Sequence, residues 1–299
     1  MRYRLGGPSQ NARRLSKLGL AALGLLWPLS SLLAAGPAPA RATDAALARV
    51  EAYNSRSFGN PGRRHVRLEL YSGDVVTRTF EVSNLWRKDD GITRTLFILH
   101  EPRGLAGTNY LLVEDPSSPA GMEVYLHLPA GERKVLTVRP GSFDEGLLGS
   151  DFGYRDLRLQ LPVAGWKYSV VGKDRLLGRP VLVLEAVSED PASPRRTRYY
   201  LSENPALLLG IDHLEAVPGG APQVVRRMRV GGLSQVAGAW TETRMVMTAG
   251  EGHSSVLTLE GFEPSYGQAL AEMFTPAALP SLAERLATLP ASPRPEAGR

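Results

Sequence analysis

An alternation of apolar and polar residues, repeated in short segments along most of the chain, constrains the fold more than any other feature. Between Arg64 and Tyr71, for example, the apolar residues Val66, Leu68 and Leu70 occupy every second position. This period is that of a β-strand with one buried face. Turn signals such as Ser-Gly-Asp, Asp-Asp-Gly and Gly-Gly separate the segments. We therefore expect one continuous antiparallel sheet, and because twist accumulates, a sheet of eleven or more strands must curl or close.

The predicted strands lie on both sides of a central loop at residues 139–157. They cover residues 64–71, 75–88, 92–100, 109–114, 122–128 and 133–138 before the loop, and 166–172, 180–187, 196–202, 206–215, 223–230, 239–248 and 254–261 after it. In the fifth strand the alternation places Met122, Val124, Leu126 and Leu128 on one face.

Three short helices are also expected. Residues 43–57 place Ala46, Val50 and Tyr53 on one helical face, and residues 268–274 and 279–289 read as terminal helices.

The N-terminal residues have the pattern of an export signal. Five basic residues precede an apolar run at 18–35, and small residues follow, so cleavage is expected after Ala40 or Ala42. A retained anchor is the alternative, and the pair Arg13 and Arg14 leaves the Sec and twin-arginine routes open. Removing the signal leaves 30 Lys plus Arg against 30 Asp plus Glu. The mature chain is therefore neutral, which argues against a nucleic-acid partner.

No arrangement of residues indicates an enzyme. The chain has no cysteine, which excludes disulfides, thiolate ligands and a lipid-modified N-terminal cysteine, and its five histidines are scattered. Ser150 does not lie in a Gly-x-Ser-x-Gly turn. We expect no catalytic residue, metal or cofactor. Two acid pairs, Asp144 with Glu145 and Asp151 with Asp156, are expected to cap turns and to pair with Arg139, Arg155 or Arg158.

Two further segments are open to two interpretations. The central loop carries Phe143, Leu147, Leu148, Phe152 and Tyr154, which is too apolar for a solvated connection. It either covers an apolar cavity or packs as an ordinary long loop on its own core. The basic run at residues 226–229 is expected to be a solvated strand face, or else a surface for anionic lipid headgroups.

The central region resembles a known family. It contains Val-Tyr-Leu-His-Leu-Pro at 124–129, Arg-Lys-Val at 133–135, Ser-Phe at 142–143 and Gly-Ser-Asp-Phe-Gly-Tyr-Arg-Asp-Leu at 149–157. These motifs are similar to those of the periplasmic outer-membrane lipoprotein-sorting proteins, the LolA-like family. Gly153 and Arg155 replace a small hydroxyl residue and an acid of the family motif, and residues 144–148 are inserted.

The resemblance implies a mainly β fold, a strongly curved antiparallel sheet that forms an unclosed β-barrel with helices across its mouth. It implies one carrier domain at 43–290, after a signal peptide at 1–40 and before a disordered tail at 291–299. Phe97, Leu99, Leu112, Val124, Leu126 and Leu128 are the candidate cavity residues. The motif and lid-loop residues are Ser142, Phe143, Gly149, Ser150, Asp151, Phe152, Tyr154, Asp156 and Leu157.

The function implied is that of a monomeric periplasmic carrier that shuttles a lipoprotein or lipid towards the outer membrane. A ~15-carbon chain in water costs on the order of 12 kcal/mol, so such a carrier must enclose it. The implied partners are the cargo, an inner-membrane transporter or release complex and an outer-membrane acceptor. The alternative is a non-catalytic accessory subunit of a transporter of the resistance-nodulation-division type, its cavity filled by its own side chains.

Overall fold

The computed structural model describes residues 39–59, 62–129, 134–236, 238–250, 252–264 and 271–287. Most of the expected signal peptide and the expected tail at 291–299 lie outside the described residues. The chain from Pro37 onwards forms one compact unit.

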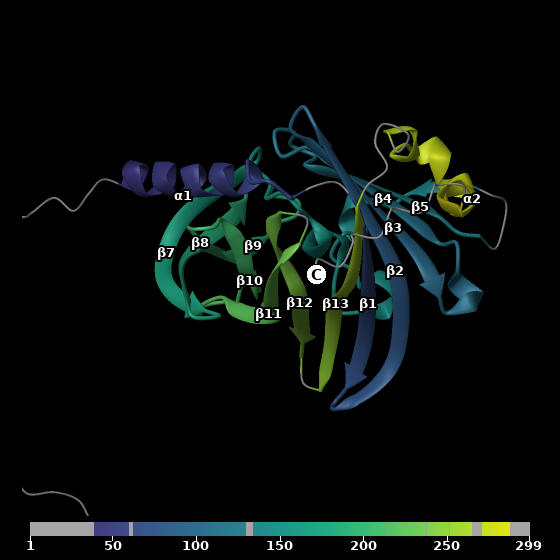
Figure 1. Cartoon of the computed structure of the whole chain (residues 1–299). Coiled ribbons are helices and arrows are strands. Elements are labelled where there is room, and N and C mark those ends of the chain that lie inside the picture. Colours follow the sequence, from purple (N-terminus) through teal and green to yellow (C-terminus); the bar gives the residue numbers. More distant parts are fainter. Residues whose placement is uncertain are drawn as a thin grey trace, which may run out of the picture. The chain divides into compact units, whose positions relative to one another are not determined.

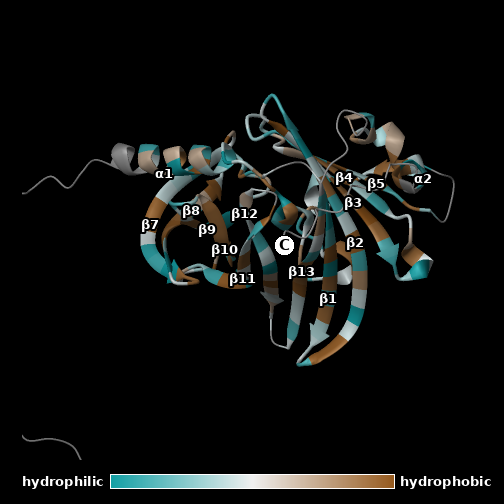
Figure 2. Cartoon of the chain, in the orientation of Figure 1, coloured by the Kyte–Doolittle hydropathy of each residue, from teal (hydrophilic) through white to brown (hydrophobic). Residues whose placement is uncertain are grey.

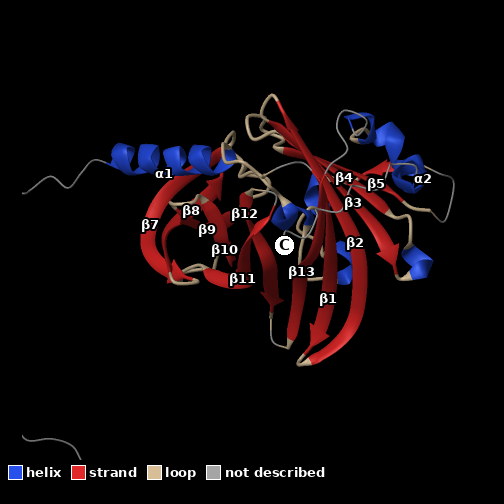
Figure 3. Ribbon diagram, viewed as in Figure 1, coloured by secondary structure: helices blue, strands red, loops and turns tan. Residues whose placement is uncertain are grey.

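The unit is built on one antiparallel sheet of 13 strands (Figures 1 and 3). The strands are β1 (Gly62–Ser72), β2 (Val75–Asp89), β3 (Ile92–Glu101), β4 (Asn109–Glu114), β5 (Met122–His127), β6 (Val135–Thr137), β7 (Trp166–Leu176), β8 (Arg179–Ser188), β9 (Arg196–Ser202), β10 (Leu207–Glu215), β11 (Gln223–Val236), β12 (Ala239–Ala249) and β13 (His253–Pro264). The sheet is strongly curved, and β6 and β7 are its two edges, so it is not closed into a barrel. The expected fold class is confirmed.

The order of the strands gives the central loop a particular position. The chain enters the middle of the sheet at β1 and runs outward to the edge strand β6. It then crosses to the opposite edge at β7 and returns to the middle, where β13 pairs with β1 and Leu257 lies opposite Leu68. The segment between β6 and β7 therefore joins the two edges that a closed barrel would pair.

Most strands form hairpins with their neighbours in sequence, as the alternation predicts (Figure 2). The tight turns have the required residues: Gly73 and Gly91 adopt φ values of +58° and +81°, which side chains with a Cβ rarely adopt.

Helix α1 (Pro39–Asn54) packs on β7. Ala46, Val50 and Tyr53 are buried, as expected from their spacing. The helix begins four residues before the predicted start, because proline suits a first turn, where its missing N–H has no partner to lose. It ends at Asn54, whose side chain donates to the Leu161 carbonyl (2.8 Å) and accepts from the Leu161 N–H (2.7 Å).

The C-terminal segment packs on β4, β5 and β6 through the 3₁₀ helix η6 (Pro276–Ser281), which continues into α2 (Leu282–Ala287). Leu279 and Leu282 join a core cluster with Leu96 and Leu111. The predicted helix at 279–289 is α-helical only from Leu282, because Pro280 cannot donate the backbone hydrogen bond of an α-helix. Part of the predicted helix at 268–274 lies outside the described residues.

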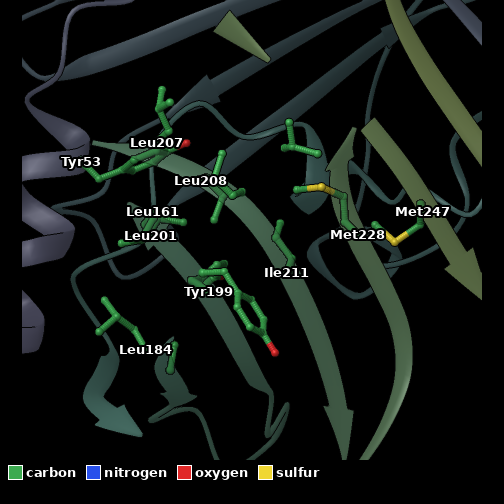
Figure 4. Close-up of a cluster of buried hydrophobic side chains, with 14 of the residues drawn as sticks. Tyr53, Leu161, Leu184, Tyr199, Leu201, Leu207, Leu208, Ile211, Met228 and Met247 are labelled. Carbon is green, nitrogen blue, oxygen red and sulfur yellow. The ribbon is translucent and has the colours of Figure 1, made fainter. Parts of the chain in front are cut away.

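The largest core cluster of the described residues extends from α1 across strands β7 to β12 and on to β1, β2 and β3, and Figure 4 shows part of it. Tyr53 of α1 lies near Leu207 and Leu208 of β10, and Met228 and Met247 continue the cluster on β11 and β12. A second surface, on β4 and β5, is covered by the central loop instead of a helix.

Candidate functional site

The loop between the two edge strands folds back over the inner face of the sheet. It contains three short 3₁₀ helices, η2 (Pro140–Ser142), η3 (Leu147–Gly149) and η4 (Tyr154–Leu157). Phe143 and Phe152 are each only 1% exposed, and Leu147 is also buried. Phe143 and Leu147 pack with Leu112 and Val124 of β4 and β5. The loop is therefore an apolar cover, which we call the lid.

The lid has a compact backbone that glycine makes possible. The Leu147 N–H donates to the Phe152 carbonyl (2.8 Å), and Gly146 and Gly153 form an isolated antiparallel bridge. A Cβ on Gly153 would lie 2.8 Å from the Phe143 carbonyl oxygen, closer than real contacts allow. Gly153 therefore allows the backbone to pass close to Phe143 and Asp144.

Asp156 fastens the lid to two strands. Its Oδ1 is 2.6 Å from Nε2 of His213 on β10, and its Oδ2 is 3.1 Å from Nη2 of Arg226 on β11. Oδ2 also accepts the Gly153 N–H (2.8 Å). Arg226 in addition donates to the carbonyls of Asp144 (3.1 Å) and Asp151 (3.3 Å). We call Asp156, His213 and Arg226 the latch.

The electrostatics of the latch keep Asp156 ionised. Burial alone would raise the pKa of this carboxyl, but the hydrogen bond and charge of His213 and the charge of Arg226 outweigh burial and hold the pKa below its ordinary value. A buried charge is tolerable when it is paired and hydrogen-bonded in this way.

Two further contacts hold the lid at its middle and just beyond its end. Ser255 of β13 donates to Oδ2 of Asp151 (2.7 Å) and accepts the Asp151 N–H (2.9 Å). Glu114 of β4 accepts the N–H groups of Leu159 and Gln160 at 2.9 to 3.1 Å. Burial raises the pKa of Glu114 to about 7, although the two backbone hydrogen bonds oppose that shift.

Beneath the lid lie two adjoining cavities, one lined by apolar side chains and the other by apolar and charged side chains together. The first has a volume of about 30 Å³, which is about one water molecule's share of liquid water, and Phe97, Leu99 and Phe152 line it. The second, of about 110 Å³, shares Phe97 and Leu157 with the first. The lid side chains occupy most of the space between the lid and the sheet.

The six cavity candidates lie in different places. Phe97 and Leu99 line the inner cavity. Leu112 and Val124 are fully buried under the lid, and Leu126 packs half-buried in the same cluster. Leu128 is 41% exposed. The prediction that it shares a buried face with Val124 and Leu126 is therefore wrong. Strand β5 stops at His127, which is itself buried, and Leu128 lies beyond the ladder.

Most of the motif residues build the lid itself. Ser150 bonds only locally among the contacts described, accepting the Phe152 N–H (3.3 Å). The Tyr154 ring lies 6.0 Å from the Tyr110 ring and 6.3 Å from the Phe143 ring, centroid to centroid. Leu157 lines both inner cavities, and Ser142 and Gly149 shape the turns. Asp144 pairs with Arg155 (3.2 Å), as expected, whereas Asp156 pairs with none of the three predicted arginines.

The basic run on β11 is not a simple solvated face. Arg226 belongs to the latch, and Arg227 and Arg229 both pair with the buried Asp212, at 3.1 and 2.8 Å. Sequence reasoning missed His213 and Asp212 as their partners. The signal was present, because an Asp-His pair interrupts the otherwise apolar strand Leu-Leu-Leu-Gly-Ile-Asp-His-Leu.

A third, larger cavity of about 400 Å³ opens beside the latch. It lies between the end of the lid and strands β9 to β11, and we call it the mouth. Arg155, Arg158 and Asp156 line it from the lid side, and Tyr199 and His213 from the strand side. Over the described ranges, no group of three or more His, Cys, Asp or Glu side chains is arranged to hold a metal ion. No helix in the described part of the chain is long and apolar enough to cross a membrane.

The chain is thus one of the proteins built on an open, curved antiparallel sheet, with a helix and an apolar lid packed on it. A family model described as an uncharacterized protein matches residues 91–281, and the chain belongs to that family. The comparison with curated protein sequences found no match.

Three crystal structures are similar to this one. A domain from Vibrio parahaemolyticus, assigned to outer membrane lipoprotein sorting, has 19% identity and a TM-score of 0.68, over 80% of this chain and 99% of its own. A DUF1329 family protein from Desulfovibrio piger has 19% identity and a TM-score of 0.66, over 80% of this chain and 99% of its own. A LolA superfamily protein from Nitrosomonas europaea has 13% identity and a TM-score of 0.56, over 77% of this chain and 97% of its own. The fold implied by the sequence resemblance is thereby confirmed.

Proposed function

We propose that this protein is a periplasmic carrier that encloses the acyl chains of a lipoprotein or lipid beneath its lid and shuttles that cargo towards the outer membrane. The observation that carries the proposal is the lid itself, an apolar cover held down by polar contacts. Phe143, Leu147 and Phe152 cover an apolar sheet surface, whereas the latch and the Asp151–Ser255 contact fasten the lid from outside that surface.

The energetics of such a cover suit reversible loading. Displacing the lid exposes apolar sheet, and an entering acyl chain restores the lost burial at ~0.8 kcal/mol for each CH₂ group. The lid side chains and the cargo therefore compete for the same surface. This exchange requires no chemical step, and we propose that the protein is not an enzyme.

The fold of the relatives supports the same proposal. One similar structure is assigned to outer membrane lipoprotein sorting and another to the LolA superfamily. By analogy we propose an exported monomer that receives cargo from an inner-membrane transporter or release complex and passes it to an outer-membrane acceptor.

One observation favours a second candidate. The lid leaves only about 30 Å³ in the innermost cavity, as expected for an accessory subunit whose cavity is permanently filled. Such a subunit would assist a membrane transporter without binding lipid. The two candidates differ in whether the lid has to open.

A reversible lock on the lid tests both candidates. Because the chain has no cysteine, Asp151→Cys with Ser255→Cys introduces a single pair, at positions whose side chains now touch at 2.7 Å. The protein is incubated with vesicles of phosphatidylethanolamine and phosphatidylglycerol, separated from them, and analysed by native mass spectrometry. We expect lipid adducts on the wild type and on the reduced variant, and none on the oxidised variant.

The outcomes separate cleanly. Equal uptake by the oxidised and reduced forms would show that the lid is not the gate. Absence of adducts from every form, including wild type purified gently from periplasmic extract, would reject the carrier and support the accessory subunit.

A further inference from the structure

The mouth carries an excess of positive charge. Five arginines line it, with three acids; the arginines are Arg155, Arg158, Arg195, Arg196 and Arg226, and the acids are Asp144, Asp156 and Glu215. Asp144 is paired with Arg155, and Asp156 with Arg226 and His213. Arg196 lies 3.5 Å from Glu185. Two arginines, Arg158 and Arg195, remain to be accounted for.

Neither guanidinium has a carboxylate within ion-pair distance among the described residues. Nε of Arg158 contacts the thioether of Met122 at 3.4 Å. Nε of Arg195 is buried with no hydrogen-bond partner, while its Nη1 donates to Ser193 (2.7 Å). Burial, and then the charge of Arg155, lowers the pKa of both side chains. Buried donors and mutually repelling cations of this kind are costly unless an anion completes them.

The mouth also adjoins the cavities beneath the lid, because they share lining residues. Arg158, Asp156 and Leu208 line both the mouth and the 110 Å³ cavity, which in turn meets the innermost cavity at Phe97 and Leu157. The inner wall of the mouth is apolar, formed in part by Trp166 and Ile211. An amphiphile could therefore place an anionic group at the arginines and its chain beneath the lid.

We propose that the mouth is a binding site for a phosphate ester, and that the phosphate belongs to the headgroup of the amphiphile whose chain lies under the lid. This inference rests on the proposed carrier function. Arg158 and Arg195 donate to the phosphate oxygens. The guanidinium fork matches phosphate geometry, and several forks around one cavity suit a tetrahedral group with acceptors in several directions.

The test compares two ligands that differ only in the phosphate. Binding of oleoyl lysophosphatidic acid and of monooleoylglycerol is measured by isothermal titration calorimetry on wild type, Arg158→Gln, Arg195→Gln and the control Arg78→Gln. Arg78 is an exposed arginine of β2 outside the mouth. We expect each mouth variant to weaken lysophosphatidic acid binding about tenfold and to leave monooleoylglycerol unchanged. The control should change neither.

Two further arms keep the result interpretable. On the wild type, added salt should weaken the binding of lysophosphatidic acid but not that of monooleoylglycerol. This measurement does not depend on the folding of any variant. Glycerol 3-phosphate and inorganic phosphate alone should bind far more weakly than the amphiphile. If either binds as tightly, the site serves a soluble phosphate and the headgroup assignment falls.

The failures of the two proposals are distinguishable. Equal, salt-independent binding of both amphiphiles by wild type and by the arginine variants would overturn the phosphate site and leave the carrier intact. Binding of neither amphiphile would overturn the carrier and this inference with it.

Discussion

At the scale of single residues, the latch predicts how firmly the lid is closed. Asp156→Asn keeps an acceptor for the Gly153 N–H but leaves the mostly buried Arg226 without its counter-charge. We expect a loss of about 3 kcal/mol in the free energy of unfolding, as for other broken buried pairs, and faster hydrogen exchange across the lid. Denaturant unfolding and exchange mass spectrometry measure both. Asp74→Asn, in an exposed turn, is the control, and an effect as small as that of the control would contradict the latch.

Glu114 and Asp156 predict opposite dependences of stability on pH. The pKa of Glu114 is raised to about 7, so the folded state holds this proton more tightly than the unfolded state. The protonated Glu114 therefore adds to the free energy of unfolding. This added stability is fully present below the ordinary pKa of 4.5 and is lost as the pH rises to about 7. The contribution of Asp156, whose pKa is lowered, is present above its ordinary value and is lost as the pH falls through its folded value.

We therefore expect Glu114→Gln to flatten the profile of unfolding free energy between pH 4.5 and about pH 7, removing a decline of about 3 kcal/mol. Unfolding measured across this range in wild type and variant checks the sign. A wild-type stability that rises over the same range would show that Glu114 is ionised at lower pH than its burial implies.

At the scale of elements, the lid backbone predicts which glycine can be replaced. Gly153→Ser restores the hydroxyl residue of the family motif but brings a Cβ to within 2.8 Å of the Phe143 carbonyl oxygen. We expect a loss of about 2 kcal/mol, because the backbone must move. Gly141→Ser is a matched control in the same loop, since nothing lies within 4 Å of the Cβ it would add. Similar melting temperatures for the two variants would contradict the close approach.

Prediction from the sequence was most successful for the helices and strands. Alternation located each strand that the structure describes, in most cases within a few residues, because each hairpin depends on local residues and turns. The helical spacing of Ala46, Val50 and Tyr53 likewise identified the buried face of α1. The apolar composition of residues 139–157 indicated that the loop packs on an apolar surface, but not whether that surface is a cargo cavity or an ordinary core.

The contacts of the lid could not be read in the same way. Asp156 meets His213 and Arg226, which lie 57 and 70 positions further along the chain, and the alternation sets no distance between such positions. The role of the mouth arginines also depends on the crossing from β6 to β7, which brings Arg158 and Arg195 to one cavity. Leu128 is exposed because strand β5 ends one residue earlier, at His127. The alternation of apolar and polar residues does not show where a strand ends.

At the scale of the whole unit, the lid is attached to an edge strand at each end. It can lift only as far as the segment between Thr137 and Trp166 allows. We expect insertion of Gly-Ser-Gly after the exposed Glu145 to speed lipid uptake from vesicles several-fold, with little effect on stability, since loop length changes closure entropy only slowly. Uptake rates by native mass spectrometry, with the same insertion after Asp74 as control, test this. Unchanged uptake would mean that the lid length does not limit loading.

The pairing of β1 with β13 has a consequence for how the fold is reached. Every other strand pair joins neighbours in sequence, so strands β1 to β6 and β7 to β13 can each assemble as a separate run of hairpins. During synthesis, β13 follows all the other described strands. Until it arrives, the two runs share no ladder, and β1 and β12 are two additional open edges. The chain is therefore most prone to aggregation just before its last strand emerges, which is when a chaperone would protect it most.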